Sequence, residues 1–282
     1  MPLIKKKDTD FYFENGHIVL TKTYLQDNLS HFKKITGGRI ASILGLNKYV
    51  TPFRVWLSIV NLYKEEMDAT LAHVGHTIEP KIRDFVSQQL NINFKSYDPF
   101  AIKWDVFKEN KIFGGIPDGE PVDTNGNFLY EEGKPMLEIK TSSFDGLVYK
   151  KIDGTMVLQK DKDGFPIIKE KMAKYKSWFD PKTNELKIND EYAYQLALYL
   201  FLRKTNYGIF AICFLNLDDY KNPEKFQINN HIIKLKEMYL DLEQFGAIIE
   251  KVKKWYENYV IKGISPALTK EDEIWVKTQL QK

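Results

Sequence analysis

The sequence predicts a single α/β domain with a mixed central sheet flanked by helices, and three observations favour this class. The expected elements follow one another as helices, then strands, then a helix, a strand and a last helix. The 282 residues contain no repeat, low-complexity segment or linker, and this length is enough for one sizeable core. The apolar run YGIFAICFL at 207–215 is typical of a strand that is buried on both faces of a sheet.

The first third of the chain predicts a hairpin followed by helices. An Asn-Gly pair at 15–16, between alternating residues, favours a type I′ turn. The segment ITGGRIASILGLNKY at 35–49 predicts a glycine-rich entry into a short helix, and a Thr-Pro pair at 51–52 has the residue types of an N-cap and a first helical position. Helical periodicity extends over 67–90, where Pro80 should kink the helix or begin its second half.

The middle of the chain predicts strands and polar arms. Residues 100–119 predict a hairpin around 109–110, and KPMLEIKTSS at 134–143 predicts a strand. A long polar insertion follows at about 145–190. It contains two turn-centred segments, each of which we expect to be a hairpin arm or a structured loop.

The last third of the chain predicts a helix, the buried strand and a second helix. EYAYQLALYLFLRKT at 191–205 has a helical pattern and precedes the apolar run. Residues 232–262 predict one long amphipathic helix that stops at Gly263.

Composition limits the classes of function. The net charge is only +3, so binding to nucleic acid would need local basic clusters. The single cysteine, Cys213, excludes an intrachain disulfide, a four-cysteine zinc site and an iron–sulfur cluster. Cys213 lies in the apolar run and is expected to be a small buried residue. No stretch has the length and apolarity of a signal peptide or a membrane span, which predicts a cytoplasmic protein that does not interact with membranes.

Acidic residues and a lysine in FGGIPDG and LEIKTSS form a candidate metal site. In a strand, Glu138 and Lys140 share one face and the residues between and beside them face the other. Asp118 lies in a turn after Pro117, and the loop that follows can return the chain and bring Asp118 beside Glu138. A divalent cation relieves the repulsion between two close carboxylates, and hard oxygen ligands favour Mg²⁺ or Mn²⁺. The alternative is a surface aspartate and an ion pair on an exposed strand.

Three further features favour the metal site. Glu79 lies on a helix with a clear apolar stripe. Gln195 and Tyr199 are four residues apart and therefore on one face of the helix at 191–205, where a glutamine needs a partner. Ser42 follows a Gly-Gly-Arg entry to a helix, where amides and a hydroxyl can hold a phosphate.

Six motifs in this order resemble the lambda-exonuclease/YqaJ-like group of the PD-(D/E)xK nuclease superfamily. They are GGRIASILGL, TPFRVWL, VGHTIEPKIRDF, GGIPDG, LEIKTSS and YAYQLALYL, and they cover about residues 36–215. The resemblance implies a restriction-endonuclease-like core, with the N-terminal hairpin and the inserted arms added to it. We expect residues 1–282 to be one nuclease domain.

The resemblance also implies roles for particular residues. Asp118 and Glu138 would bind a catalytic Mg²⁺, with the carbonyl of Ile139 as a further ligand and Glu79 completing the site directly or through water. Lys140 would orient the attacking water and stabilise the developing charge, and Gln195 would hold this lysine or the nucleophile. The residues expected to contact DNA are Ser42, Arg39, Thr141, Ser142 and Tyr199.

The resemblance therefore implies a Mg²⁺-dependent deoxyribonuclease, with Mn²⁺ as a substitute, that acts as a double-strand exonuclease in recombination or repair. An endonuclease, a flap or single-strand nuclease, and a catalytically inactive DNA-binding or assembly module are alternatives. A different Mg²⁺ enzyme is a further one. Expected partners are DNA and either further copies of the chain or a single-strand annealing protein.

Some residues near these motifs have more than one interpretation. The lysines of the insertion could grip DNA or another subunit, or form a solvated surface. His76 lies three residues before Glu79 and could face the metal, although a structural role or a place in the DNA groove is the preferred interpretation. Trp178, in the insertion, is the tryptophan that could stack on a base, whereas packing in the core is expected for the tryptophans in general.

Overall fold

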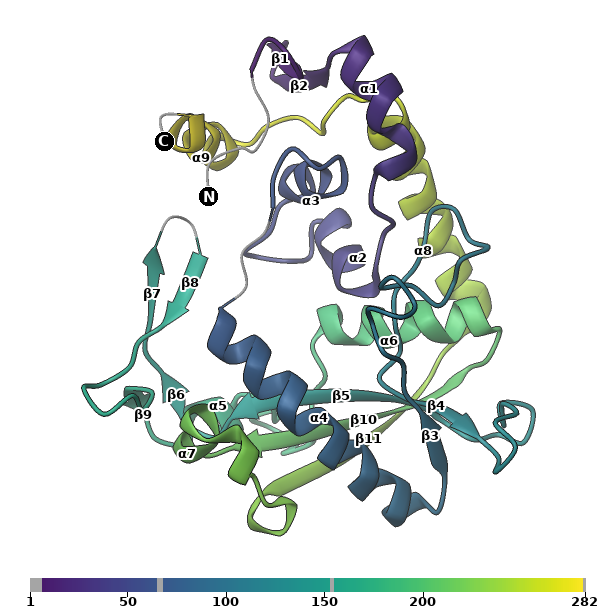
Figure 1. The fold of residues 1–282 in the computed structure, drawn as a ribbon, viewed down its shortest axis with the longest axis vertical. Coiled ribbons are helices and arrows are strands. Elements are labelled where there is room, and N and C mark those ends of the chain that lie inside the picture. Colours follow the sequence, from purple (N-terminus) through teal and green to yellow (C-terminus); the bar gives the residue numbers. More distant parts are fainter. Residues whose placement is uncertain (1–6, 65–67, 153–154, 281–282) are drawn as a thin grey trace.

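A three-stranded mixed sheet lies at the centre of the fold (Figure 1). The computed structural model describes residues 7–64, 68–152 and 155–280. The strand order is β11-β10-β5, in which β10 pairs parallel with β5 and antiparallel with β11. The bounds of these strands are Met136–Ser143 for β5, Tyr207–Leu215 for β10 and Ile232–Tyr239 for β11. The predicted class, α/β with a mixed sheet flanked by helices, is confirmed.

Helices cover both faces of the sheet. Helix α4 (Ala69–Leu90) packs against one face through Val74, Ile78, Ile82 and Val86. On the other face, α6 (Asp190–Arg203) and α8 (Leu242–Trp255) share a larger core with alternate residues of β10. Figure 1 shows α4 crossing in front of the strands of the sheet and α6 running above them. The predicted helices at 67–90 and 191–205 are present, and α4 continues through Pro80.

The alternation of β5 determines which face carries each of its side chains. Leu137 and Ile139 pack in the core beneath α4, whereas Met136 belongs to the core on the α6 side. Because strand side chains alternate between the two faces, Glu138 and Lys140 share the α6 face with Met136. The strand pattern thus places an acid and a base at the boundary of the larger core.

The N-terminal hairpin, three short α-helices and one 3₁₀ helix precede α4. The hairpin turns at Asn15 and Gly16, both with positive φ, as the Asn-Gly pair predicts. Thr51 caps its helix by accepting a hydrogen bond from the N–H of Arg54. The bounds are Phe11–Glu14 for β1, His17–Leu20 for β2, Lys22–Asn28 for α1, Leu29–His31 for η1, Gly37–Ile43 for α2 and Pro52–Ile59 for α3.

The insertion after β5 contains short paired strands and a short helix. Strand β7 pairs with β8 as a hairpin, and β6 pairs with β9, so paired arms are present in this region. The bounds are Gly146–Leu147 for β6, Tyr149–Ile152 for β7, Thr155–Leu158 for β8, Ile168–Glu170 for β9 and Ala173–Lys176 for α5. The remaining elements are β3 (Asn93–Lys95), β4 (Glu120–Val122), α7 (Leu217–Lys221), η2 (Pro223–Lys225), η3 (Ile228–Asn230), the π-helix η4 (Tyr256–Ile261) and α9 (Lys270–Leu280).

Two predicted elements are wrong. Residues 232–262 form strand β11 and then α8 with η4, rather than one helix. The first eight of these residues pair with the edge of β10, whose backbone groups would otherwise lack partners. Residues 100–119, all of them described, form turns rather than a hairpin. Asp105 and Asn110 hold these turns by accepting backbone N–H bonds.

None of the helices in the described ranges is long and apolar enough to cross a membrane.

Candidate active site

Strand β5 presents a buried acid and a lysine to helix α6. The Nζ of Lys140 lies 2.6 Å from Oε1 of Glu138 and 3.0 Å from Oε1 of Gln195, and it donates a hydrogen bond to each. The side chain of Glu138 is fully buried, and its second oxygen, Oε2, has no hydrogen-bond partner among the described residues. A buried carboxylate with one unpartnered oxygen is costly unless an ion or a proton occupies that side.

The turn before β4 places Asp118 beside this strand. Oδ2 of Asp118 accepts the backbone N–H of Ile139 at 2.7 Å, and the carbonyl of Asp118 accepts from Nε of Arg83 at 2.7 Å. Gly115 precedes the turn with φ of +140°, where a Cβ would lie 2.6 Å from the hydroxyl oxygen of Tyr199. Only glycine fits this close approach, so the Gly-Gly-Ile-Pro sequence is what seats Asp118 against the core.

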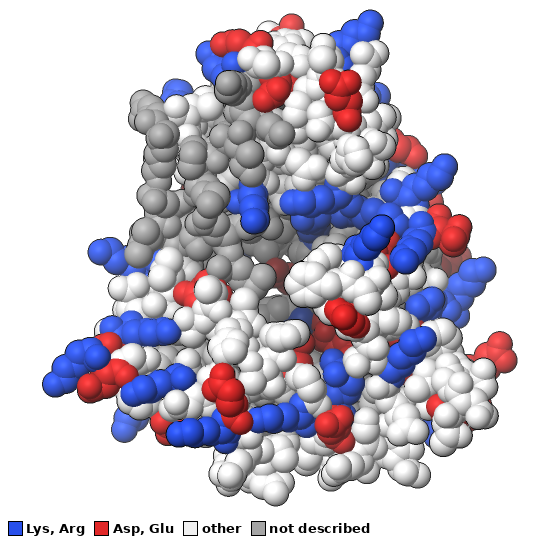
Figure 2. Space-filling model, viewed as in Figure 1, with Lys and Arg blue, Asp and Glu red and all other residues white. Residues whose placement is uncertain are grey.

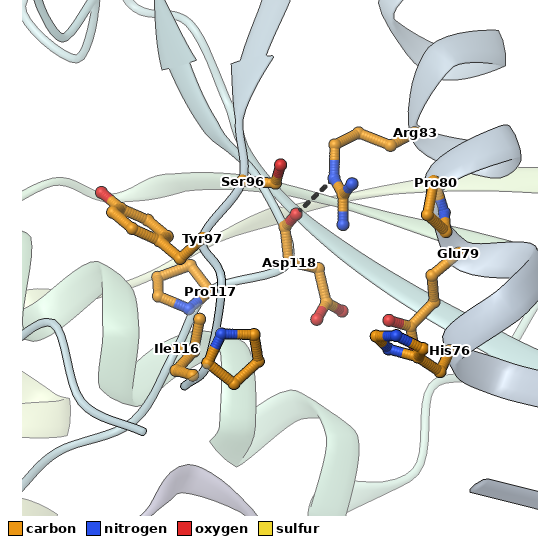
Figure 3. Close-up of a pocket in the computed structure, with 10 residues that line it drawn as sticks. His76, Glu79, Pro80, Arg83, Ser96, Tyr97, Ile116, Pro117 and Asp118 are labelled. Atoms are coloured by element: carbon orange, nitrogen blue, oxygen red, sulfur yellow. Dashed lines mark hydrogen bonds between the residues drawn. The ribbon is translucent and has the colours of Figure 1, made fainter. Parts of the chain in front are cut away.

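Helix α4 contributes Glu79 to the same place. A cavity of about 310 Å³ lies between α4 and the turn, and Figure 3 shows the carboxylates of Glu79 and Asp118 facing one another across it. Figure 2 shows a hollow near the centre of this face of the molecule, with acidic atoms in it and lysines and arginines on the surfaces around it. The cavity is lined by His76, Glu79, Pro80, Arg83, Ser96, Tyr97, Pro99, Ile116, Pro117 and Asp118.

Burial raises the pKa values of the three carboxyl groups, and for Glu79 and Glu138 the charge of Asp118 adds to the rise. Burial, and next the charge of Asp118, raise the pKa of Glu138 to about 8, against the opposing effect of Lys140. The same two causes raise the pKa of Glu79 to about 7. Burial also raises the pKa of Asp118, although Lys140 and the N–H of Ile139 oppose the rise. The site therefore holds more negative charge than its own cations balance once the carboxyls ionise.

The environment of Lys140 keeps it protonated. Burial lowers its pKa, but attraction to Glu138 and Asp118 outweighs burial, and the net direction is upward. The face of the Tyr192 ring lies 4.9 Å from the Lys140 nitrogen. A protonated amine in this position can neutralise charge on a bound anion.

This donor set fits a divalent cation. A hard cation would satisfy three features of the site. They are Oε2 of Glu138, which has no partner among the described residues, the ionisable groups of Asp118 and Glu79, and the excess of negative charge. Within the part of the chain that the structure describes, no three histidine, cysteine, aspartate or glutamate side chains already converge on one point.

Helix α2 lies close to the site through its glycine. A Cβ on Gly37 would lie 2.5 Å from the Cα of Gln195, so this glycine allows α2 and α6 to touch. Ser42 is buried on α2. Arg39 donates to the carbonyl of Lys34 at 2.9 Å and to the hydroxyl of Ser58 at 3.2 Å, contacts that hold α2 to its neighbours. The DNA contacts of Ser42 and Arg39 stay predictions.

The residues after Lys140 and the tyrosine of α6 lie mostly within the protein. Thr141 is half-buried, and Ser142 is buried with its hydroxyl accepting the indole N–H of Trp178 at 2.9 Å. Tyr199 is buried and stacks on Phe107. The DNA contacts expected of Thr141, Ser142 and Tyr199 also stay predictions, whereas the base-stacking role considered for Trp178 is wrong because its ring is buried.

Two residues of the site, Arg83 and Tyr192, were not predicted from the sequence. Arg83 donates a hydrogen bond to the carbonyl of Asp118 and so holds its turn. It lies four residues after Glu79, so both are on one face of α4. Tyr192 lies three residues before Gln195, which places it on the same face of α6 and above Lys140. Helical spacing from the predicted residues would have found both.

The site combines a carboxylate in a turn with an acid and a lysine that lie two residues apart on a strand of a mixed sheet. The preceding helix adds a glutamate and the following helix a glutamine. This combination defines the PD-(D/E)xK class of nuclease fold. The family profile of the YqaJ-like viral recombinase domain matches residues 29–207. The chain belongs to this family, which is lambda-exonuclease-like and consists of phosphodiester hydrolases.

Two relatives from mycoplasmas match the chain over nearly all of its residues. The chain is 46% identical over 277 residues to the uncharacterized protein MG373 of Mycoplasma genitalium, and the match covers 98% of each protein. It is 43% identical, with the same coverage, to the MG373 homolog of Mycoplasma pneumoniae.

Solved structures of an alkaline exonuclease are more distant. The LHK-Exo structure from Laribacter hongkongensis has 14% identity and a TM-score of 0.48, with 93% of this chain and 99% of that chain covered. LHK-Exo in complex with dAMP has 13% identity and a TM-score of 0.44, with 93% and 97% covered.

Proposed function

We propose that the chain is a divalent-metal-dependent deoxyribonuclease that hydrolyses DNA phosphodiester bonds, and that it acts as a double-strand exonuclease. The observation that carries this proposal is the buried Glu138, which has one oxygen on Lys140 and the other, beside two more carboxyl groups, without a partner among the residues that the structure describes. Membership of a family of phosphodiester hydrolases supports the same reaction class.

Each residue of the site has a task in this reaction. Asp118, Glu138 and Glu79 would hold the cation, with the carbonyl of Ile139 as a further oxygen ligand. When bound, a divalent cation supplies a water of lowered pKa and neutralises charge at the phosphate. Lys140, kept protonated, would orient an attacking water and stabilise charge that develops on the phosphate oxygens.

Gln195 keeps Lys140 in place. Its side-chain oxygen accepts one N–H of the ammonium at 3.0 Å, which leaves a further proton of Lys140 for the substrate. Ser42 and Arg39 on α2, together with Thr141, Ser142 and Tyr199, are proposed to contact the DNA near the cleaved bond. We take Mg²⁺ as the ion, with Mn²⁺ as a substitute, and place the enzyme in DNA recombination or repair in the cytoplasm.

Digestion of end-labelled linear DNA with Mg²⁺, compared with EDTA, tests the proposal. Cleavage should need the ion and should disappear in purified, folded Asp118→Ala, Glu138→Ala and Lys140→Ala proteins. Glu132→Ala is the matched control, because Glu132 is an exposed acid in the loop between Asp118 and Glu138. Undiminished cleavage by the three site variants would sink the mechanism.

The same assay separates the alternatives. An exonuclease degrades linear DNA and spares covalently closed circles, whereas an endonuclease of the same fold cuts both. A flap or single-strand nuclease prefers substrates with unpaired ends. A protein that binds DNA without cleaving it under any of these conditions would be an inactive binding or assembly module. Gel filtration, alone and with DNA, tests whether copies of the chain assemble.

A further inference from the structure

Three groups surround the ammonium of Lys140 among the described residues. Two are the oxygens of Glu138 and Gln195, and the third is the face of the Tyr192 ring at 4.9 Å. An aromatic face attracts a cation through its quadrupole and is most effective where water is excluded. The ring therefore acts together with these two oxygens to limit where the charge of Lys140 can lie.

Tyr192 is itself held in place from the insertion. The ring of Trp178 stacks on it with a centroid distance of 5.7 Å and an interplanar angle of 15°. The indole N–H of Trp178 donates to the hydroxyl of Ser142 at 2.9 Å. Because Ser142 lies two residues after Lys140, both are on one face of β5, and the contacts form a closed circuit from Lys140 through Tyr192 and Trp178 back to the same strand.

An aromatic cluster anchors Trp178 to the sheet. Trp178 packs edge-on against Phe214 of β10, and Tyr175 contacts Phe144, Phe179 and Phe214 at centroid distances from 4.7 to 5.0 Å. The part of the insertion nearest α6 is thus packed into the core, whereas its lysines at 169, 171, 174 and 176 are exposed.

We infer that Tyr192 is a positioning residue for Lys140, and that the insertion contributes to the active site by bracing Tyr192 through Trp178. This inference rests on the proposed nuclease function. It assigns the insertion a role beyond any contact with DNA: the insertion fixes the direction from which the ammonium approaches the phosphate.

Replacement of Tyr192 gives the first test. Tyr192→Leu should lower kcat about 3–30-fold with KM changed less than twofold, since the contact acts on the lysine rather than on DNA binding. Tyr192→Phe keeps the aromatic face and should retain most of the wild-type kcat. Tyr194→Leu is the matched control: this tyrosine lies on the same helix and stacks on Phe245, away from Lys140.

Fluorination separates attraction from packing. Phenylalanine analogues with one, two and three ring fluorines at position 192 keep the shape of the ring but withdraw electron density from its face. The logarithm of kcat should fall stepwise along this series. Equal kcat values along the series, or a wild-type kcat in Tyr192→Leu, would overturn the inference while leaving the nuclease proposal intact.

A spectroscopic arm needs no cleavage. In protein with isotope-labelled lysine, the side-chain resonance of Lys140, assigned with Lys140→Arg, should carry a ring-current shift that Tyr192→Phe retains and Tyr192→Leu loses. If the wild type cleaves no DNA, the nuclease proposal fails, and the resonance still decides whether Tyr192 positions Lys140. An unchanged resonance in Tyr192→Leu overturns the inference in either case.

Discussion

Two fully buried glutamates lie on neighbouring segments of this molecule, and their surroundings differ. Glu120 on β4 receives two hydrogen bonds from Arg203, at 2.6 and 2.8 Å, and one each from the hydroxyls of Tyr97 and Tyr130. Glu138 on β5 receives one from Lys140, and its Oε2 receives none from any described residue. Burial alone therefore does not mark a functional acid: the first glutamate has a donor for each oxygen, and the second has not.

The two clusters are connected, because the structural one supports the other. Glu120 lies two residues after Asp118, and Gly119 between them exchanges backbone hydrogen bonds with Leu137 of β5. Arg203, sandwiched between the rings of Phe107 and Phe128 at 4.7 and 5.1 Å, ties the end of α6 to this turn. The hydrogen bonds of Glu120 thus hold the turn that places Asp118 beside Glu138. A substitution can still be chosen that changes only one of the two clusters.

The largest expected effect is on activity, from Glu138→Gln. The amide keeps the volume but loses the charge that would hold a cation, and we expect a loss in kcat of about 10³-fold or more, equivalent to about 4 kcal/mol. The fold should persist, because Oε2 of Glu138 makes no hydrogen bond to any described residue that the substitution would break. Single-turnover digestion measures the loss, and near-UV circular dichroism checks the fold. Cleavage within tenfold of wild type would mean that Glu138 is a structural acid like Glu120.

The next effect is on stability, from Glu120→Ala. Removing this carboxylate leaves the guanidinium of Arg203 and two phenol hydroxyls without their hydrogen-bond acceptor. This loss should lower the free energy of unfolding by about 3–5 kcal/mol. Urea titration measures the change, with Glu131→Ala, an exposed acid in the next loop, as the control. Cleavage per folded molecule, assayed in the cold, should fall far less than in Glu138→Gln. A stable but inactive Glu120→Ala protein would place Glu120 in the catalytic site.

The third effect concerns pH and metal. Because the pKa of Glu79 is raised to about 7 and that of Glu138 to about 8, the folded protein without metal holds protons that the unfolded chain has released. The stability linked to these protons is fully present below about pH 4.3, the ordinary pKa of glutamate, and is lost as the pH rises through 7 and 8. The melting temperature in EDTA should fall between pH 5 and 9, and Glu138→Gln should flatten the fall.

A divalent cation should reverse this loss. It binds the ionised carboxylates of the folded state, so Mg²⁺ at 100 times its dissociation constant adds about 2.7 kcal/mol, more readily at pH 8 than at pH 6. Differential scanning calorimetry with and without Mg²⁺ makes the comparison. Melting temperatures that rise with pH in EDTA, or that ignore Mg²⁺ at pH 8, would contradict it.

Local patterns in the sequence predicted most of this arrangement. The alternation in LEIKTSS predicted that Glu138 and Lys140 share a face, and the loop after Asp118 was expected to return the chain and bring Asp118 beside Glu138; the structure has both. These predictions succeeded because each depends on a few neighbouring residues. The roles of the residues in DNA cleavage remain predictions until they are assayed.

The rest depends on partners that are distant in the sequence. Residues 232–239 carry apolar and charged side chains that suit a helix nearly as well as a strand, and only the unpaired edge of β10 selects the strand. Glu120 is paired with Arg203, which lies 83 residues later in the chain. No local pattern distinguishes Glu120 from Asp123 or Glu131 in the same acidic segment, although Glu120 is buried and they are not.

The smallest expected effect comes from removing one donor of the satisfied cluster, with Tyr130→Phe. The hydroxyl of Tyr130 lies 2.5 Å from Oε1 of Glu120, but that oxygen keeps its bond from Nε of Arg203. We therefore expect a loss of about 1–2 kcal/mol in the free energy of unfolding, measured by urea titration, with no change in kcat. A loss as large as that of Glu120→Ala would mean that the four donors act as one cooperative unit. In that event the full set of donors would stabilise the buried side chain of Glu120 as a unit, and Oε2 of Glu138, which has no partner among the described residues, would indicate a binding site more clearly.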